Sequence, residues 1–211
     1  MKISNECNME LMSRYEDNHF DLAIVDPPYG INADVEQNKQ SESNRISNGG
    51  KWKKYHKSKW DIEVPNDIYF KEIKRVSKNQ IVWGGNYFFN LHLFGVIIWN
   101  KFKNLKMKEG ELAKTSFNTF KIFNMSRADA YINDCDSKIH PTQKPVKLYE
   151  WLLMNYAKEG DKILDTHLGS GSIALACHNL KYDLTACELD KDYFDSAMKR
   201  IKRHQQQIQM F

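Results

Sequence analysis

The sequence predicts an α/β fold with a mainly parallel sheet, and three observations support this prediction. Segments with helical spacing alternate with short apolar runs in the second half of the chain, as in strand–helix–strand units. The 211 residues, 41% hydrophobic and 27% charged, suffice for one full core, so we expect a single domain over residues 1–211. Apolar runs typical of buried parallel strands lie at residues 21–26, 80–83, 96–99, 162–165 and 184–188.

The first half of the chain contains one long segment without apolar periodicity. The strand at 21–26 stops at a double proline, and residues 31–59 then are rich in Asn, Ser, Lys and Gly. Loops of this length are usually functional or disordered, so we predict a mobile loop. Residues 65–77 begin at a proline and have near-helical apolar spacing, which predicts a helix.

The second half alternates more regularly. Residues 101–139 are irregular, with a β-like piece at 119–123, and after them the apolar spacing becomes helical again. A glycine turn follows the strand at 162–165. The predicted helices of this half cover residues 145–157, 172–180 and 191–204.

Composition narrows the class of protein. The net charge of +4 mildly favours a polyanionic partner. The first 20 residues hold no apolar run long enough for a signal peptide, and no segment approaches the roughly 18 apolar residues of a membrane span. We therefore expect a cytoplasmic protein without a membrane partner. No CxxC pair or zinc-like spacing predicts a metal site among Cys7, Cys135, Cys177 and Cys187, which we expect to be reduced.

The motif Asp26-Pro27-Pro28-Tyr29-Gly30 follows the first predicted strand, where open α/β sheets bind ligands. A proline-rich turn would explain the prolines and glycine but not the carboxylate that ends the strand. The prolines leave rigid carbonyl acceptors beside Asp26, a cluster that suits a primary amine with two hydrogens to donate. An aromatic amine such as that of adenine would gain nucleophilicity from hydrogen bonds to Asp26 and the Pro27 carbonyl, while Tyr29 stacks on the base.

A second motif, residues 165–172 (DTHLGSGS), follows a strand and opens a helix. Its glycines allow close approach of a ligand, and the helix N-terminus offers free N–H groups. Glu188 ends the next strand, where an acidic residue binds a ribose diol. Because the same glycines fit the dinucleotide fingerprint, NAD binding is an open alternative at this point.

A basic stretch at residues 51–60 places five lysines among three aromatic side chains. A solvated loop is the simpler interpretation of a lysine run, but interleaved rings also favour phosphate neutralisation and base stacking. Residues 101–108 form a second basic stretch. The predicted DNA-binding residues are Lys51, Trp52, Lys53, Lys54, Tyr55, Lys57, Lys101, Lys103 and Lys106.

The first motif resembles the [DNS]-P-P-[YFW] motif of amino-methylating DNA methyltransferases, and its Asp is similar to that of the N6-adenine enzymes. The second resembles the D-P-F-x-G-S-G-T motif of that family, with departures at Thr166, His167 and Ser172. In the family, the first Asp serves the ammonium end of S-adenosylmethionine and the Phe packs beside the cofactor. We interpret His167 as a tolerated replacement rather than a new catalytic base.

Further segments extend the resemblance over nearly the whole chain. Residues 140–145 (HPTQKP) are similar to a family segment near the methionine end of the cofactor, and residues 3–7 (ISNEC) resemble I-x-G-D-C, whose acid faces its adenine. Residues 83–88, 99–101 and 111–113 resemble phage-type adenine methylases; from burial patterns alone we expect Trp83 and Trp99 to pack in the core. The cofactor-binding residues that the resemblance implies are Glu6, Asp26, His140, Thr142, Lys144, Asp165, His167, Leu168, Gly169, Ser170, Gly171 and Glu188.

The order of the motifs resembles the circularly permuted β-type family. This implies a catalytic half (1–98), a target-recognition segment (99–139) and a cofactor half (140–211). It also implies a Rossmann-like, mostly parallel seven-stranded sheet with one reversed strand, and transfer of methyl from S-adenosylmethionine to N6 of a flipped adenine in DNA. The setting would be restriction–modification in a bacterium or its phage, and a homodimer is one assembly that the sequence permits.

Three alternatives stay open. The same chemistry on N4 of cytosine or on RNA is the nearest, and only the modified nucleoside distinguishes it. A catalytically inactive DNA-binding subunit is a second, although the intact motif from Asp26 to Tyr29 argues against it. An NAD-dependent oxidoreductase is the third, and cofactor binding would separate it from a methyltransferase.

Overall fold

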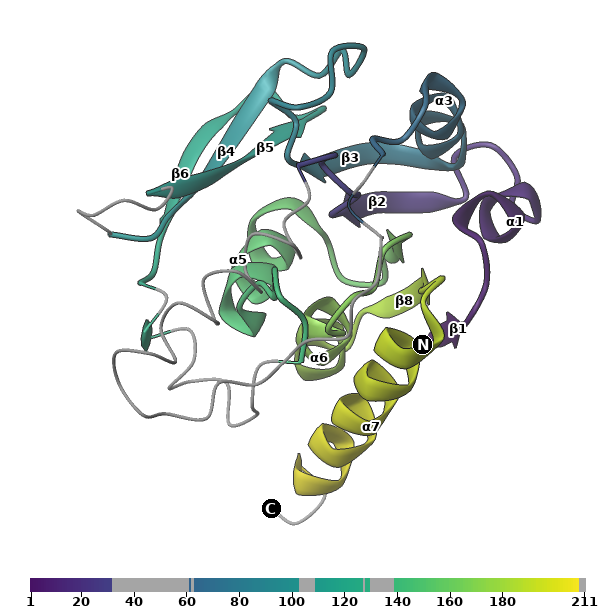
Figure 1. Cartoon of the computed structure of the whole chain (residues 1–211), viewed down its shortest axis with the longest axis vertical. Coiled ribbons are helices and arrows are strands. Elements are labelled where there is room, and N and C mark those ends of the chain that lie inside the picture. Colours follow the sequence, from purple (N-terminus) through teal and green to yellow (C-terminus); the bar gives the residue numbers. More distant parts are fainter. Residues whose placement is uncertain (32–60, 62, 103–108, 127, 130–138, 209–211) are drawn as a thin grey trace.

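The computed structural model describes residues 1–31, 61, 63–102, 109–126, 128–129 and 139–208. Its strands form one sheet in the order β1-β8-β7-β2-β3-β5-β4-β6 (Figure 1). The strands are β1 (Lys2–Ser4), β2 (Phe20–Val25), β3 (Ser77–Trp83), β4 (Gly95–Asn100), β5 (Gly110–Thr115), β6 (Phe120–Asn124), β7 (Lys162–Asp165) and β8 (Asp183–Cys187).

The predicted parallel sheet with one reversed strand is confirmed. Strand β5 runs antiparallel to both neighbours, β3 and β4, and every other pair in the sheet is parallel. The predicted number of seven strands is wrong, because the described residues form eight. The additional strand is β1, an edge strand that pairs with β8 through only three residues. A strand this short leaves no recognisable pattern in the sequence.

Helices cover both faces of the sheet (Figure 1). Helices α1 (Asn8–Ser13) and α3 (Asp67–Val76) share one hydrophobic core with one face of β2, and α3 starts where the Asn66 side chain accepts the Tyr69 N–H. None of the described helices is long and apolar enough to cross a membrane. The helices on the opposite face are α5 (Val146–Tyr156), α6 (Ser172–Leu180) and α7 (Lys191–Ile208).

Burial on both faces explains the continuous apolar runs of the strands. Along β2, Leu22 and Ile24 pack with α5 and α6, whereas Ala23 and Val25 pack with α1 and α3. A strand covered on both sides has no solvent-facing positions, so its sequence does not alternate. Trp83 and Trp99 are buried in the core as predicted.

Four parallel strands end side by side at one edge of the sheet. Strands β1, β8, β7 and β2 are neighbours in that order, so the segments after them converge. Two backbone hydrogen bonds tie these segments together, from Glu188 N–H to the Ser4 carbonyl and from Leu168 N–H to the Cys187 carbonyl. The fold therefore brings the catalytic and glycine motifs, 139 residues apart from Asp26 to Asp165, to the same edge.

Candidate active site

A cavity of about 370 Å³ opens at this edge, a volume typical of small-molecule sites. It is lined by residues from five separate segments of the chain, most of which the sequence singles out. The predicted residues that line it are Glu6, Asp26, Pro28, His140, Thr142, Lys144, His167, Leu168, Gly169, Ser170 and Glu188. Cys7, Gln143 and Thr166 also line it; they stand within the quoted motifs but outside the predicted cofactor-binding set. Lining residues that the sequence analysis missed are Asn8, Tyr149, Leu189, Asp190 and Tyr193.

Two residues of the glycine motif lie beneath the cavity surface rather than on it. The buried carboxylate of Asp165 accepts the His167 N–H at 3.0 Å. Burial, with the nearby charges of Asp26 and Glu188, raises the pKa of Asp165 to about 8. Gly171 begins helix α6 with a φ of 75° and packs against α7, where an added Cβ would lie 3.2 Å from Ile201.

Gly169 and Glu188 form the centre of the cavity wall. The Gly169 N–H donates to Glu188 Oε2 at 2.8 Å, and the Asp190 N–H donates to Oε1 at 3.0 Å. Burial raises the pKa of Glu188. Gly169 has a φ of 53°, and a Cβ built on it would meet no protein atom closer than 3.8 Å. The space beside this backbone is thus open to a ligand.

His167 contributes an uncharged ring to the cavity. Its Nε2 lies 3.1 Å from the Asn8 amide, and its Nδ1 lies 2.9 Å from the Thr166 hydroxyl. Burial lowers the pKa of His167 to about 4, so the ring is neutral near pH 7. Tyr69 packs against it edge to face at 5.4 Å.

Glu6 lines the cavity with its charge already paired. Both carboxylate oxygens accept hydrogen bonds from the Arg14 guanidinium, at 2.6 and 2.7 Å, and Ser4 also donates to it. The Arg14 hydrogen bonds lower the pKa of Glu6. Arg14 gave no signal in the sequence, because it lies eight residues away and at the end of a six-residue helix.

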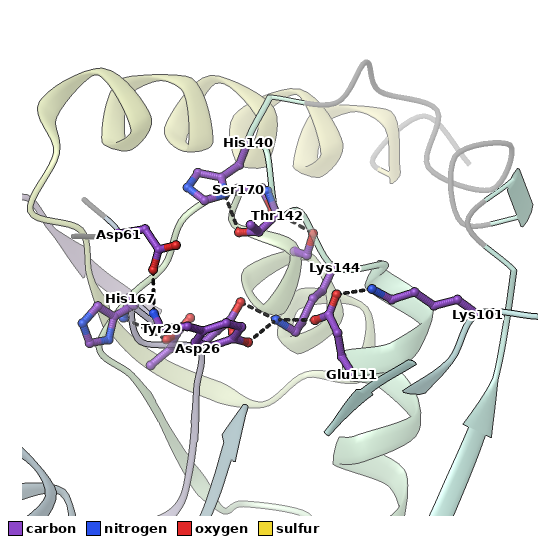
Figure 2. Close-up of polar contacts among 12 residues, drawn as sticks. Asp26, Tyr29, Asp61, Lys101, Glu111, His140, Thr142, Lys144, His167 and Ser170 are labelled. Carbon is purple, nitrogen blue, oxygen red and sulfur yellow. Dashed lines mark hydrogen bonds and ion pairs between the residues drawn. The ribbon is translucent and has the colours of Figure 1, made fainter. Parts of the chain in front are cut away.

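The Asp26 carboxylate is held by two side chains, those of Tyr29 and Lys144 (Figure 2). Tyr29 donates its hydroxyl to Oδ1 at 2.5 Å, and the Lys144 ammonium lies 2.5 Å from Oδ2. Burial raises the pKa of Asp26, while the charge of Lys144 opposes that shift. The Tyr29 ring stacks on Tyr87 at 5.0 Å between centroids and 11° between planes. Neither Tyr29 nor Pro27 lines the cavity itself.

Two residues outside the predicted set hold this motif in place. Asp61 is buried, and its Oδ1 accepts the N–H groups of Tyr29 at 2.6 Å and Gly30 at 3.0 Å. Gly84 has a φ of 71°, and a Cβ there would lie 2.1 Å from the Tyr29 ring. The Gly-Gly pair after Trp83 was a visible sequence signal for a special backbone position at Gly84. Asp61 gave no such signal, because it is an isolated Asp that follows a polar stretch.

One predicted DNA contact needs correction. Lys101 is buried and its ammonium pairs with Glu111, so it is not exposed at the surface for contact with a phosphate. A buried cation requires a partner, and the β5 carboxylate next to it supplies one. The remaining predicted DNA-binding residues, in 51–57 and at 103 and 106, lie outside the described residues, as does the predicted mobile loop apart from residue 31.

The described part of the chain contains no group of three or more His, Cys, Asp or Glu side chains that could hold a metal ion. Within the same residues, Cys7, Cys177 and Cys187 are free thiols, and burial raises the pKa of both Cys177 and Cys187. Cys135 lies outside them.

Solved structures of DNA methyltransferases share this fold. The crystal structure of the M1.HpyAVI–SAM complex matches with a TM-score of 0.60 at 17% identity, over 95% of this chain and 98% of that one. PvuII DNA methyltransferase, described as cytosine-N4-specific, also has a TM-score of 0.60, at 12% identity over 97% and 89% of the two chains. The architecture is therefore that of the S-adenosylmethionine-dependent DNA methyltransferases.

Sequence relatives point the same way. Type II methyltransferase M.HpaI of Haemophilus parainfluenzae is 34% identical over 74 residues, and M2.DpnII of Streptococcus pneumoniae is 38% identical over 63 residues. These matches cover 34% and 30% of this chain and 24% of each relative's length. The family model N6_N4_Mtase, described as DNA methylase, matches residues 37–199, about three quarters of the chain. The chain therefore belongs to this family of DNA methylases.

Proposed function

We propose that the protein transfers a methyl group from S-adenosylmethionine to the N6 amine of an adenine flipped out of DNA. The observation that carries the proposal is that Asp26 and the glycine turn line one cavity. Direct transfer requires the amine acceptor and the methyl donor to share a site, because the two reacting atoms must meet in line.

The cavity suits the cofactor in size and in its polar groups. Glu188 would bind the ribose diol, and the open backbone at Gly169 admits close approach. Residues 140–144 would contact the methionine end, and Glu6 the adenine end. When bound, the cofactor supplies an electrophilic methyl group.

Asp26 would hold the target amine. A primary amine already fits there, since the Lys144 ammonium lies within hydrogen-bond distance of the carboxylate. Hydrogen bonds from the amine to Asp26 and to the Pro27 carbonyl draw the nitrogen lone pair out of conjugation with the ring and aim it at the methyl group. The stacked pair of Tyr29 and Tyr87 would support the flipped base.

The methylated nitrogen must then lose a proton. Asp26 is the carboxylate in contact with the amine in this arrangement, and burial raises its pKa, which favours acceptance of that proton. The proton thus passes from the amine nitrogen to an Asp26 oxygen and from there to solvent. This is modest base catalysis combined with positioning.

The test is transfer of labelled methyl from S-adenosylmethionine to unmodified DNA of mixed sequence. We expect Asp26→Ala to lower the rate by roughly a hundredfold or more, with cofactor affinity within a few-fold by calorimetry. Asp21→Ala is a matched control, because Asp21 lies at the opposite end of the same strand and pairs with Lys78. Near wild-type transfer by Asp26→Ala would refute the proposed role.

The identity of the base is a separate question. An Asp in first place favours adenine, whereas the structural neighbour PvuII methyltransferase is described as cytosine-N4-specific. Digestion of the product DNA to nucleosides should give N6-methyladenine. Recovery of N4-methylcytosine would keep the chemistry and change the substrate, and transfer to RNA alone would remove DNA as the substrate.

A further inference from the structure

Four charged side chains alternate in sign along a continuous row beside the cavity (Figure 2). Lys101 pairs with Glu111, Glu111 lies 3.1 Å from the Lys144 ammonium, and Lys144 lies 2.5 Å from Asp26. Both lysine side chains are almost fully buried, at 3% and 1% exposure. Two cations and two anions cancel, which is the condition for burying so many charges together.

Three distant parts of the sequence build this row. Glu111 lies on the reversed strand β5, opposite Trp99 of β4, and Lys101 follows the end of β4. Lys144 comes from the segment just before α5, and Asp26 follows β2. Strand β5, antiparallel to both of its neighbours, therefore brings a carboxylate to the catalytic motif.

Lys144 occupies the place that the target amine needs. Its ammonium bonds to Asp26, the carboxylate expected to hold the amine of the base, and lies 3.3 Å from the Tyr29 hydroxyl. A carboxylate oxygen that holds a lysine is less able to accept the amine. Release of Lys144 from Asp26 would therefore strengthen the hold of the carboxylate on the base.

We propose that Glu111 is a positioning residue that takes over the Lys144 ammonium when the target amine binds to Asp26, and that Lys101 holds Glu111 ready for it. The inference rests on the proposed function. Glu111 does not touch the base; it acts by freeing the carboxylate that does.

The physical reason is the cost of an unpaired buried charge. Without Glu111, Lys144 could leave Asp26 only by becoming a buried ammonium without a carboxylate partner, which is strongly unfavourable. Burial alone would raise the pKa of Glu111, but Lys144 and Lys101 lower it to about 2. Glu111 is therefore ionised throughout the neutral range and always available as the second partner.

The first test compares kcat of the wild type, Glu111→Gln and the double variant Glu111→Gln/Lys144→Met. Glu111→Gln should lower kcat at least tenfold, because Lys144 then stays on Asp26, while cofactor affinity is unchanged by calorimetry. The double variant should recover part of the loss, because no ammonium competes for Asp26. A merely structural Glu111 predicts the reverse, a double variant no better than the single one, and that result would overturn the inference.

The second readout is the pH profile of kcat. The titratable groups around Asp26 are Tyr29, Tyr69, Lys144, Tyr149, Asp165 and Glu111. Removing the like charge of Glu111 should move the acidic limb, which follows ionisation of Asp26, to lower pH. Lys144→Met removes an opposite charge and should move the same limb to higher pH. If the acidic limbs of Glu111→Gln and Lys144→Met do not shift in these opposite directions from that of the wild type, the result would count against the inference.

Glu150→Gln is the matched control, since this buried carboxylate of α5 also has a lysine partner, but that partner is Lys147 and not Lys144, the lysine bound to Asp26. It should leave kcat and the profile unchanged. If Glu111→Gln does not fold, Glu111→Asp keeps the charge and shortens the reach; its kcat should fall relative to Glu150→Asp, and an unchanged kcat refutes the inference. Failure of the wild type to methylate DNA would instead refute the proposed function.

Discussion

The Asp61 carboxylate accepts the backbone N–H of Tyr29 at 2.6 Å, so the catalytic turn is fixed from the far end of a polar segment. The same oxygen accepts the Gly30 N–H at 3.0 Å. Residues 30 and 61 therefore meet beside the cavity, although 30 residues separate them along the chain.

Asp61→Ala should remove the side chain that holds the backbone of Tyr29 and Gly30 in place. Two backbone donors lose their acceptor, which costs about 1–3 kcal/mol of unfolding free energy for a buried group left unsatisfied. Tyr29 is no longer held, and misplacement of a positioning group by about 1 Å can cost roughly a hundredfold in rate. We expect kcat to fall at least tenfold with cofactor affinity unchanged. Glu63→Ala, an exposed carboxylate two residues later, is the control; equal rates for the two variants would contradict the role of Asp61.

Much of the fold was predictable because its strands are buried on both faces. Strands β2, β3, β7 and β8 gave continuous apolar runs, and the predicted helix at 172–180 matches α6 at both ends. Strand β5 was missed because its sequence, GELAKT, carries Glu111 and Lys114. Glu111 is compatible with a covered strand only because Lys101 and Lys144 neutralise it, and a linear pattern does not reveal such partners.

The site was predictable where its residues belong to local motifs. Residues 26–29 and 165–171 were visible because their chemistry is contiguous in the sequence. Asp61 and Glu111 act through contacts with residues more than 30 positions away, at Tyr29 and Lys144. Lys101 was misassigned because a lysine in a basic stretch is expected to be exposed, and its pairing with Glu111, on the neighbouring strand, leaves no signal in the sequence.

The cofactor pocket gives the next prediction. Glu188→Ala should weaken S-adenosylmethionine binding by roughly 1–3 kcal/mol through loss of charge-assisted hydrogen bonds to the ribose. Gly169→Val should abolish binding, because a branched side chain at a φ of 53° is strained and fills the space open to the ligand. Calorimetric titrations with S-adenosylmethionine and with NAD check both. Unchanged isotherms would show that the cofactor does not bind at this turn. Tight binding of NAD would support the alternative that the turn binds a dinucleotide.

Asp165 should make the protein less stable as pH rises. Its folded pKa is about 8 against an ordinary 3.8, so the folded protein retains a proton that the unfolded chain releases. The stability from this group is complete below pH 4 and is lost as pH rises from about 4 to 8. Asp165→Asn removes this dependence. Urea unfolding at pH 6 and pH 8 should show a smaller loss of stability in the variant than in the wild type; parallel losses would show that Asp165 is already ionised in the folded protein.

His167 should act in the opposite direction. Its folded pKa is about 4 and its ordinary value 6.5, so the unfolded chain binds a proton that the folded protein refuses. The wild type should lose up to about 3 kcal/mol from this group as pH falls from 6.5 to 4. His167→Phe, which restores the residue of the motif that the segment resembles, should lose less over that range. Unfolding midpoints at pH 6.5 and 4.5 measure it, and identical losses would show that the imidazole titrates normally.

The final prediction concerns DNA contact by the basic residues between Gly30 and Asp61. Gly30 and Asp61, the described residues at the two ends of that segment, are in contact at the catalytic motif, and we expect the lysines between them to contact a duplex whose base enters the cavity. Each lysine that neutralises a phosphate steepens the salt dependence of binding by about one unit of log–log slope. Changing the five lysines to Ala should therefore weaken DNA binding for all sequences and flatten that slope, while cofactor affinity stays the same, because the cavity is lined by residues outside this segment. Trp52→Ala or Tyr55→Ala should instead lower turnover more than affinity, if either ring supports the flipped state. A salt slope equal to that of the control would show that the segment makes no phosphate contacts and would move the search to residues 102–108. The variant replaces Lys51, Lys53, Lys54, Lys57 and Lys59, and the control replaces five exposed lysines elsewhere, Lys71, Lys74, Lys158, Lys162 and Lys199.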